Sequence, residues 1–149
     1  MDVLEHLQVV ELSSGTAGPI VGQLLADFGA EVIKVESPAG DPARGLPGFA
    51  VWNRGKQSVT VDPEDAERCS WLGDVIAGAD VCLVSDPGAL RQFRLDVGQL
   101  TRRNPRLLVV QTPVYAGDAP WLGGRESNGM LAAAAAAAGY ERHDERPGR

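Results

Sequence analysis

The sequence has few aromatic residues, few cysteines and no excess of positive charge. Aromatic residues make up 5% of the 149 residues, so the core must consist mainly of valine, leucine, isoleucine and alanine. The two cysteines, Cys69 and Cys82, lie among apolar neighbours and outside any Cys-x-x-Cys pair, which indicates buried free thiols. The formal net charge of −6 argues against nucleic acid or an anionic membrane as a partner, because both bind basic patches.

Targeting segments and metal-binding patterns are also missing. The stretch from Met1 to Leu7 has neither a positive cluster nor a long apolar run, so it is not typical of a signal peptide. The apolar stretch 130–138 is too short to span a bilayer. His6 and His143 stand near the two ends, and no metal-ligand spacing involves them. We therefore expect a cytoplasmic protein that binds no metal and no membrane.

What the sequence does contain is an alternation of strand and helix patterns. Runs with β-branched residues predict strands at 8–12 and 31–36. Between them, Pro19 suits the first position of a helix and Gly29 suits the residue just past its end. The apolar residues that fall on one face of this helix are Ile20, Val21, Leu24, Leu25 and Phe28.

The alternation continues along the chain and predicts the fold class. A loop rich in proline and glycine is expected over 37–48. The further strands are predicted at 58–61, 81–84 and 107–112. The next helix is predicted to have Asp62 as its N-cap, Pro63 at its first position and an acidic first turn, and to end at Gly78; its apolar stripe is Ala66, Cys69, Leu72 and Ile76. A short helix is predicted from Asp86-Pro87, carrying Leu90 and Phe93, and another from the cap Asp96 to near Arg103. We predict an α/β fold: a Rossmann-like, doubly wound, mainly parallel sheet of about five or six strands with helices on both faces.

Two turns contain residues that could bind a ligand. The turn at 15–19 has two glycines but lacks the Gly-x-Gly-x-x-Gly spacing. It is either a tight connection that needs small residues or a backbone surface that a nucleotide phosphate can approach at a helix start. Residues 53–56 place two cations beside a glycine, which fits a solvated turn or a phosphate contact. The missing P-loop and dinucleotide patterns make ATP and NAD poor candidates.

In combination, these segments resemble the amino-terminal half of the family III CoA-transferases. That family includes formyl-CoA and carnitine CoA-transferases, and α-methylacyl-CoA racemase is a relative. The matching segments are Ala17-Gly18-Pro19, Gly22 to Glu36, Gly40 to Arg44 and Asn53 to Val59, and the similarity continues to Pro120. The resemblance implies a Rossmann-like domain that binds coenzyme A (CoA), within a longer chain that passes through a second domain and interlocks with a partner chain.

The resemblance also implies positions for CoA contacts. It places the CoA loop on Ser14, Gly15, Thr16 and Ala17. The stretch beside the adenine pocket falls on residues 89–93, which include Ala89, Gln92 and Phe93. Ser37 stands where some relatives have a phosphate-binding arginine, and Asp86 adds a negative charge nearby. Arg44, Arg54 and Lys56 could supply the positive charge instead.

The family's nucleophile has no carboxylate counterpart at the expected position. In the family, a carboxylate attacks the acyl-CoA thioester to give a mixed anhydride, and the released CoA thiolate then forms an enzyme-bound thioester from which the acceptor acid takes CoA. Counting forward from Pro120 without gaps places this role on Asn128, whose neutral amide cannot form the anhydride. Asn128-Gly129 can also be a turn or a helix cap. Deamidation of Asn128 would generate an aspartate at this position. Glu126 could take the place of the nucleophile if the turn is reshaped.

These expectations divide the chain into a CoA-binding Rossmann-like domain over 1–125 and a remainder over 126–149. The remainder contains seven consecutive alanines, Ala132 to Ala138, which predict a helix, and a polar tail leading toward a second domain that this sequence lacks. We expect the chain to be the CoA-binding portion of a CoA-transferase that acts on an acyl-CoA and a carboxylic acid acceptor. We also expect a homo-oligomer or pairing with a sister CoA-transferase domain. The alternatives are a degenerate, non-catalytic module of the same family and an unrelated nucleotide-binding domain.

Overall fold

Five parallel strands form one sheet in the order β3-β2-β1-β4-β5. The structure is a computed structural model, and it describes residues 3–85 and 87–112. The strands are β1 (Gln8–Glu11), β2 (Glu31–Glu36), β3 (Gln57–Thr60), β4 (Val81–Val84) and β5 (Leu108–Gln111). Val10 in the central strand pairs with Ile33 on one side and with Cys82 on the other. The sheet confirms the predicted α/β class.

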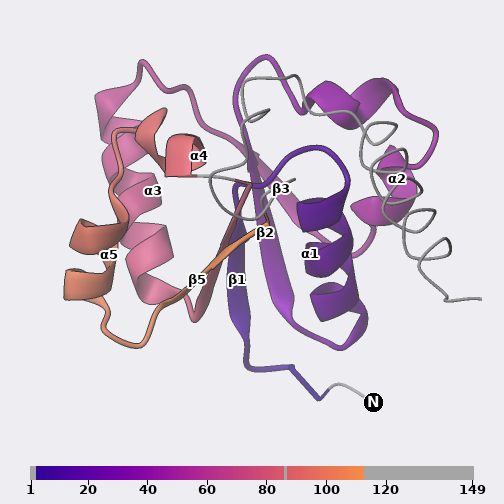
Figure 1. Cartoon of the computed structure of the whole chain (residues 1–149), viewed down its shortest axis with the longest axis horizontal. Helices are drawn as coiled ribbons and strands as arrows, with labels where there is room; N and C mark the ends of the chain where they lie inside the picture. The colour runs from indigo at the N-terminus through magenta and orange to yellow at the C-terminus, as the bar shows by residue number, and fades with distance from the viewer. Residues whose placement is uncertain (1–2, 86, 113–149) are drawn as a thin grey trace, which may run out of the picture. The chain divides into compact units, whose positions relative to one another are not determined.

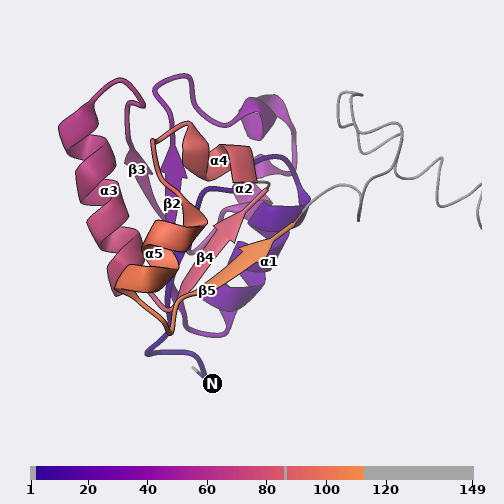
Figure 2. The same cartoon turned by 60° about the vertical axis from the view of Figure 1, so that its left-hand side comes forward.

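Helices cover both faces of the sheet, as the alternating pattern predicts. The helices are α1 (Ala17–Asp27), the 3₁₀ turn η1 (Pro42–Gly45), α2 (Phe49–Trp52), α3 (Ala66–Gly78), α4 (Pro87–Arg91) and α5 (Val97–Arg103). Figures 1 and 2 show α1 on one side of the sheet and α3 and α5 on the other. None of the helices in the described ranges is long and apolar enough to cross a membrane.

Two separate apolar clusters lie on the two faces, because successive strand residues point in opposite directions. Val9 belongs to the cluster under α1, which also contains Leu25. Val10 belongs to the larger cluster on the other face, where Leu72 of α3 and Leu100 of α5 are buried. The central strands β1 and β4 are therefore buried on both sides over most of their length, which is typical of a parallel sheet covered by helices, whereas the edge strand β3 is largely exposed.

The direction of winding reverses between β1 and β4. The chain leaves β1 through α1 to reach β2 and then β3, and it returns through α3 to β4 on the other side of β1. In open parallel sheets, ligands bind in the crevice at the carboxyl ends of the strands beside such a reversal. The topology therefore points to the ends of β1, β2 and β4 as the place to look for a site.

The first helix packs by only part of the face that its apolar spacing indicates: Val21 and Leu25 contact the core, but two other residues do not. Leu24 and Phe28 are 49% and 54% exposed, although they fall on the predicted apolar face. The buried positions of α1 are instead Gly18, Pro19, Gly22 and Gln23. A charged side chain, Glu11, projects from β1 beneath the helix at Gly22 and leaves no space there for a side chain.

Smaller corrections concern where the other elements begin and end. The N-cap of α3 is Asp65, whose carboxylate accepts a hydrogen bond from the Arg68 amide, and Asp62 stands outside the helix. Phe93 lies just beyond α4 rather than within it. The loop predicted over 37–48 contains η1 and leads into α2. The predicted alanine helix at 132–138 and the boundary at 125/126 lie outside the described residues.

Candidate functional site

A pocket of about 480 Å³ opens at the carboxyl ends of β1, β2 and β4. One wall is formed by the end of β1 and the residues after it, and the opposite wall by the end of β2 and the loop that follows. The third side is formed by Ser85 and by α4 with the turn after it. The lining residues are Leu12 to Ser14, Lys34 to Ser37, Ala39 to Pro42, Ser85, Gly88, Ala89, Gln92 and Phe93. This is the position that the winding reversal indicates.

Four of the predicted CoA contacts line this pocket, from two distant parts of the sequence. They are Ser14, Ala89, Gln92 and Phe93. The Ser14 amide donates to the Ser85 hydroxyl over 2.9 Å, which links the end of β1 to the end of β4. Gln92 Nε2 donates to the Ala89 carbonyl oxygen over 3.2 Å.

The other three residues of the predicted CoA loop follow directly after Ser14 and are not among the lining residues. Gly15 has φ +79°, a conformation that residues with a side chain rarely adopt, and a Cβ there would meet nothing within 4 Å. Thr16 is the N-cap residue of α1 and Ala17 is its first residue. The small residues of this turn therefore bring the N-terminus of α1 close to the end of β1.

Arg44 stands beside the pocket and is held in place by an acidic residue. Its Nε and Nη2 donate to the two carboxylate oxygens of Glu36, each over 2.8 Å. This bidentate hydrogen bond is the main reason why the pKa of Arg44 is raised above its ordinary value. The guanidinium also lies over the Phe49 ring, 5.0 Å from its centroid. The side chain remains 55% exposed, so it can still contact a ligand at the rim.

Arg54 lies away from the pocket. Its guanidinium donates to Asp27 over 2.6 Å, and Asp27 is the last residue of α1. Because α1 runs from the carboxyl end of β1 to the amino end of β2, this ion pair lies at the edge of the sheet opposite the pocket.

Lys56 is buried beneath α1 and bonded entirely within the protein. Its ammonium donates to Glu11 Oε2 over 2.7 Å, to the Pro19 carbonyl over 2.8 Å and to Asn53 Oδ1 over 3.0 Å. An ammonium has three N–H donors, so these contacts satisfy all of them. Burial lowers the pKa of Lys56, and the hydrogen bond to Glu11 opposes this effect. The geometry gives this lysine a structural role.

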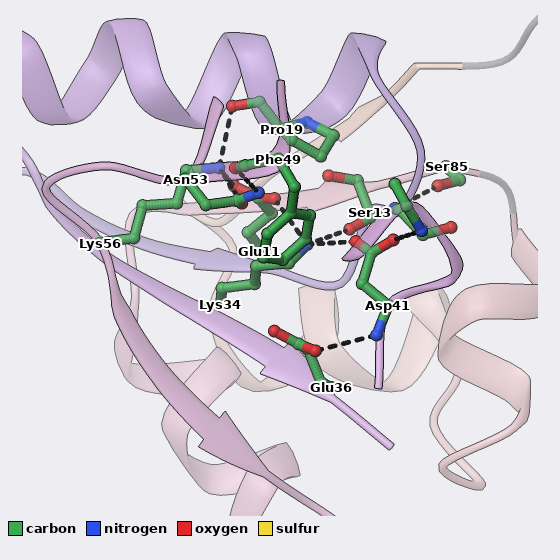
Figure 3. Close-up of polar contacts among 12 residues, drawn as sticks. Glu11, Ser13, Pro19, Lys34, Glu36, Asp41, Phe49, Asn53, Lys56 and Ser85 are labelled. Carbon is green, nitrogen blue, oxygen red and sulfur yellow. Dashed lines mark hydrogen bonds and ion pairs between the residues drawn. The ribbon is translucent and has the colours of Figure 1, made fainter. Parts of the chain in front are cut away.

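The pocket also contains a buried charge network that the sequence patterns did not indicate. Lys34, 2% exposed, contacts Glu11 Oε1 at 3.3 Å, the Ser13 carbonyl at 2.9 Å and Asp41 Oδ2 at 2.9 Å. Figure 3 shows these side chains converging between β1, β2 and the loop after β2. The sequence offered one clue, because Glu11 and Lys34 are charged residues directly beside the apolar residues of two predicted strands.

The lining is therefore polar but offers no unneutralised cation among the described residues. Lys34 forms ion pairs with Glu11 and Asp41, and Glu36 forms an ion pair with Arg44. Two buried oxygens, Ser13 Oγ and Asp41 Oδ2, have no hydrogen-bond partner within the described part of the chain, although Asp41 Oδ2 forms the ion pair with Lys34. Such a lining suits an uncharged group that carries hydrogen-bonding atoms, with the charged parts of a ligand outside the pocket.

Two further predictions concern the catalytic position and a metal site. Asn128 lies outside the described residues. Within the residues that the structure describes, no group of three or more His, Cys, Asp or Glu side chains could hold a metal ion.

Comparison with known proteins gives consistent matches. The model of CoA-transferase family III matches residues 4–149. The probable fatty acyl-CoA transferase Rv3272 of Mycobacterium tuberculosis is 37% identical in an alignment of 129 residues that covers 78% of this chain and 33% of that protein. Succinyl-CoA–D-citramalate CoA-transferase of Chloroflexus aurantiacus is 36% identical over 129 residues, covering 79% of this chain and 32% of that protein.

The solved structures agree with the sequence matches. The orthorhombic crystal form of Rv3272 superposes with a TM-score of 0.76 at 36% identity and covers 91% of this chain and 38% of that chain. The chain thus spans about a third of the length of the curated relatives it matches.

Proposed function

The chain belongs to CoA-transferase family III, and from this premise we propose that it is the CoA-binding portion of a CoA-transferase. In the full assembly, CoA would pass from an acyl-CoA thioester to a carboxylic acid. The observation that carries the proposal is the pocket at the winding reversal, because its lining joins Ser14 to the 89–93 segment. We infer a cytoplasmic location from the sequence alone.

The adenosine end of CoA is the part that suits this pocket. Adenine and the ribose ring are rich in hydrogen-bonding atoms and uncharged apart from the ribose 3′-phosphate, which would have to point toward the rim. The lining provides hydroxyl and amide groups beside apolar surface from Leu12, Val35 and Phe93. A volume of about 480 Å³ lies within the range of small-ligand sites.

The phosphates of CoA would lie at the rim. The turn Ser14 to Ala17 leads into the N-terminus of α1, and a helix N-terminus favours negative charge. Arg44 is the cation that the structure places beside the pocket with an exposed guanidinium. Arg54 and Lys56 are not part of the proposed contacts, because one lies at the opposite edge and the other is fully bonded internally.

We propose that group transfer depends on a carboxylate that the Asn128 position does not supply. The family's reaction needs a carboxylate that attacks the thioester carbon and expels the CoA thiolate, and an amide at Asn128 cannot do so. We propose that the chain transfers CoA only together with a further domain or a second chain. The beta subunit of succinyl-CoA–L-malate CoA-transferase of Chloroflexus aurantiacus is 32% identical over 129 residues, and a relative that is one subunit of an enzyme is compatible with such pairing. Sedimentation velocity would test it, and a strictly monomeric chain that turns over acyl-CoA would contradict it.

Calorimetry with CoA, NAD and ATP in parallel tests the proposed ligand. We expect CoA to bind and the other two to bind weakly or not at all. Ala89→Phe should abolish CoA binding by filling the pocket, whereas the same change at the exposed Ala66 on α3 should leave binding unchanged. Equal binding by both variants would place CoA elsewhere, and preference for NAD or ATP would reject the proposal.

A non-catalytic module is the second candidate, and the amide at position 128 favours it. Asn128→Asp separates the two candidates in a thioester exchange assay with the complete assembly. If exchange appears only in the variant, the native protein is a binding module with an intact scaffold. If the native protein is active and Asn128→Ala leaves the rate unchanged, the nucleophile is another residue.

A further inference from the structure

The two facing walls of the pocket are joined by one buried ammonium group. Lys34 projects from β2, and its Nζ contacts the Ser13 carbonyl on the β1 side and Asp41 Oδ2 in the loop after β2, both at 2.9 Å. Ser13 and Asp41 themselves line the pocket. Figure 3 shows Lys34 between these two groups. A single side chain therefore bridges the two walls at this point.

Asp41 connects the ion pair with Lys34 to the rest of its loop through two further hydrogen bonds. Its Oδ1 accepts a hydrogen bond from the Ala43 amide over 2.7 Å and so caps η1, and its own amide donates to Glu36 Oε2 over 2.9 Å. Glu36 in turn holds Arg44. The loop residues that line the pocket, Ala39 to Pro42, are thus tied to the sheet through Asp41 and Glu36.

The two carboxylates that contact Lys34 differ in how much they depend on it. Glu11 has a second cation, Lys56, at 2.7 Å. Asp41 is almost fully buried, and among the described residues Lys34 is its only ion-pair partner. Loss of the Lys34 charge would therefore leave Glu11 paired and Asp41 unpaired in a buried position, which is strongly unfavourable. The loop carrying Asp41 is the part that would move.

We propose that Lys34 is a positioning residue for CoA binding, acting through Asp41 to hold the loop after β2 against the end of β1. This inference rests on the proposed function, since it assigns the pocket to CoA. We assign Lys34 no contact with the ligand, because its Nζ is held by hydrogen bonds to Glu11 Oε1 and the Ser13 carbonyl and by the ion pair with Asp41 Oδ2. It acts on affinity by keeping the pocket in its binding shape before the ligand arrives.

A double-mutant cycle on CoA affinity tests the proposal with the chain as it exists. Lys34→Met removes the charge at similar length. Asp41→Asn removes the ion pair but keeps an oxygen that can accept from the Ala43 amide. We expect each single variant to raise the calorimetric Kd for CoA about tenfold, and the double variant to be no weaker than the weaker single variant within about twofold.

The matched control is Asp65→Ala, which removes the α3 cap without touching the pocket. It should lower the melting temperature and leave the Kd for CoA unchanged. Hydrogen exchange supplies a second readout that needs no ligand. In both single variants the amides of residues 37–45 should exchange about tenfold faster, while those of α3 keep their rates.

The outcomes separate this inference from the proposed function. No CoA binding by the unaltered chain would overturn the proposed function and the assignment to CoA with it. Binding by the unaltered chain with unchanged Kd in Asp41→Asn would overturn the positioning role alone. Additive losses in the double variant, or faster exchange throughout the fold, would mean that Lys34 contributes only to general stability. If Lys34→Met does not fold, Asp41→Asn still decides the question by its Kd and its exchange pattern.

Discussion

Single residues around Glu11 determine how closely α1 approaches the sheet. Glu11 is fully buried and bonded to Lys34 and Lys56. Gly22 of α1 lies directly over its carboxylate, so that a Cβ at this position would collide with Glu11 Oε2 and lie 3.1 Å from Lys56 Nζ. The absence of a side chain at Gly22 is therefore what allows a buried ion pair to fit beneath the helix.

Gly22→Ala should destabilise the protein although alanine favours helix. The added methyl must displace buried charges, and such overpacking costs about 1–3 kcal/mol, more than the roughly 1 kcal/mol gained in helix propensity. Gly78→Ala at the end of α3 is the control, because its Cβ meets nothing within 4 Å. Urea unfolding measures both variants, and equal stability of the two would contradict the steric argument.

Cys82 should be chemically inert in the folded protein. Burial raises the pKa of its thiol from 9.0 to about 12. Between these values the folded state holds a proton that the unfolded state has lost, so this group makes the free energy of unfolding fall as pH rises from 9.0 toward about 12. A disulfide reagent at about pH 8 should label neither buried cysteine before unfolding and both after it. Rapid labelling of Cys82 in the native protein would be incompatible with its burial.

At the scale of elements, the N-cap of α3 lies three residues later in the chain than the sequence pattern predicts. Asp62 and Asp65 both precede the helix and both carry a suitable carboxylate. Asp62 Oδ1 accepts from the Glu64 amide, forming a local turn, and Asp65 Oδ1 accepts from the Arg68 amide at the helix start. Cys69 lies beneath this junction, with its Sγ 3.6 Å from the Asp62 carbonyl oxygen.

Asp65→Ala should cost about 1 kcal/mol of stability, which is typical of a lost N-cap. Asp62→Ala removes an exposed turn contact and should change the stability by less than about 0.5 kcal/mol. Chemical denaturation of the two variants side by side measures the difference. A larger loss of stability in Asp62→Ala than in Asp65→Ala would mean that Asp62 is the effective cap.

At the scale of the whole molecule, CoA binding should stabilise the fold. A ligand that binds only the folded state adds about 2.7 kcal/mol at a hundredfold excess over its Kd. Thermal unfolding should therefore shift upward with CoA concentration in the unaltered chain and in Ala66→Phe. Ala89→Phe should show no shift. A shift of equal size in Ala89→Phe would mean that the stabilising ligand occupies another surface.

The strands and helices were largely predictable because their signals are local. The apolar run Val81 to Val84 predicts a covered parallel strand, and it is buried throughout. Asp96 was identified as a cap by position, and its carboxylate accepts from the Gln99 amide. The apolar face of α1 was less predictable, because exposure of Leu24 and Phe28 depends on what lies beneath the helix rather than on the helix itself.

The sequence by itself determined the order of elements, the parallel sheet, the family and the segments that meet at the pocket. Periodicity, capping and turn chemistry act over a few residues and leave a readable pattern. Only the tertiary structure decided what each cation does. Lys56 and Glu11 are 45 residues apart and pair because two strands and a helix bring them together, so a lysine that could have met a phosphate is neutralised inside the fold. Charges interact through space, and their partners are set by the packing of the whole chain.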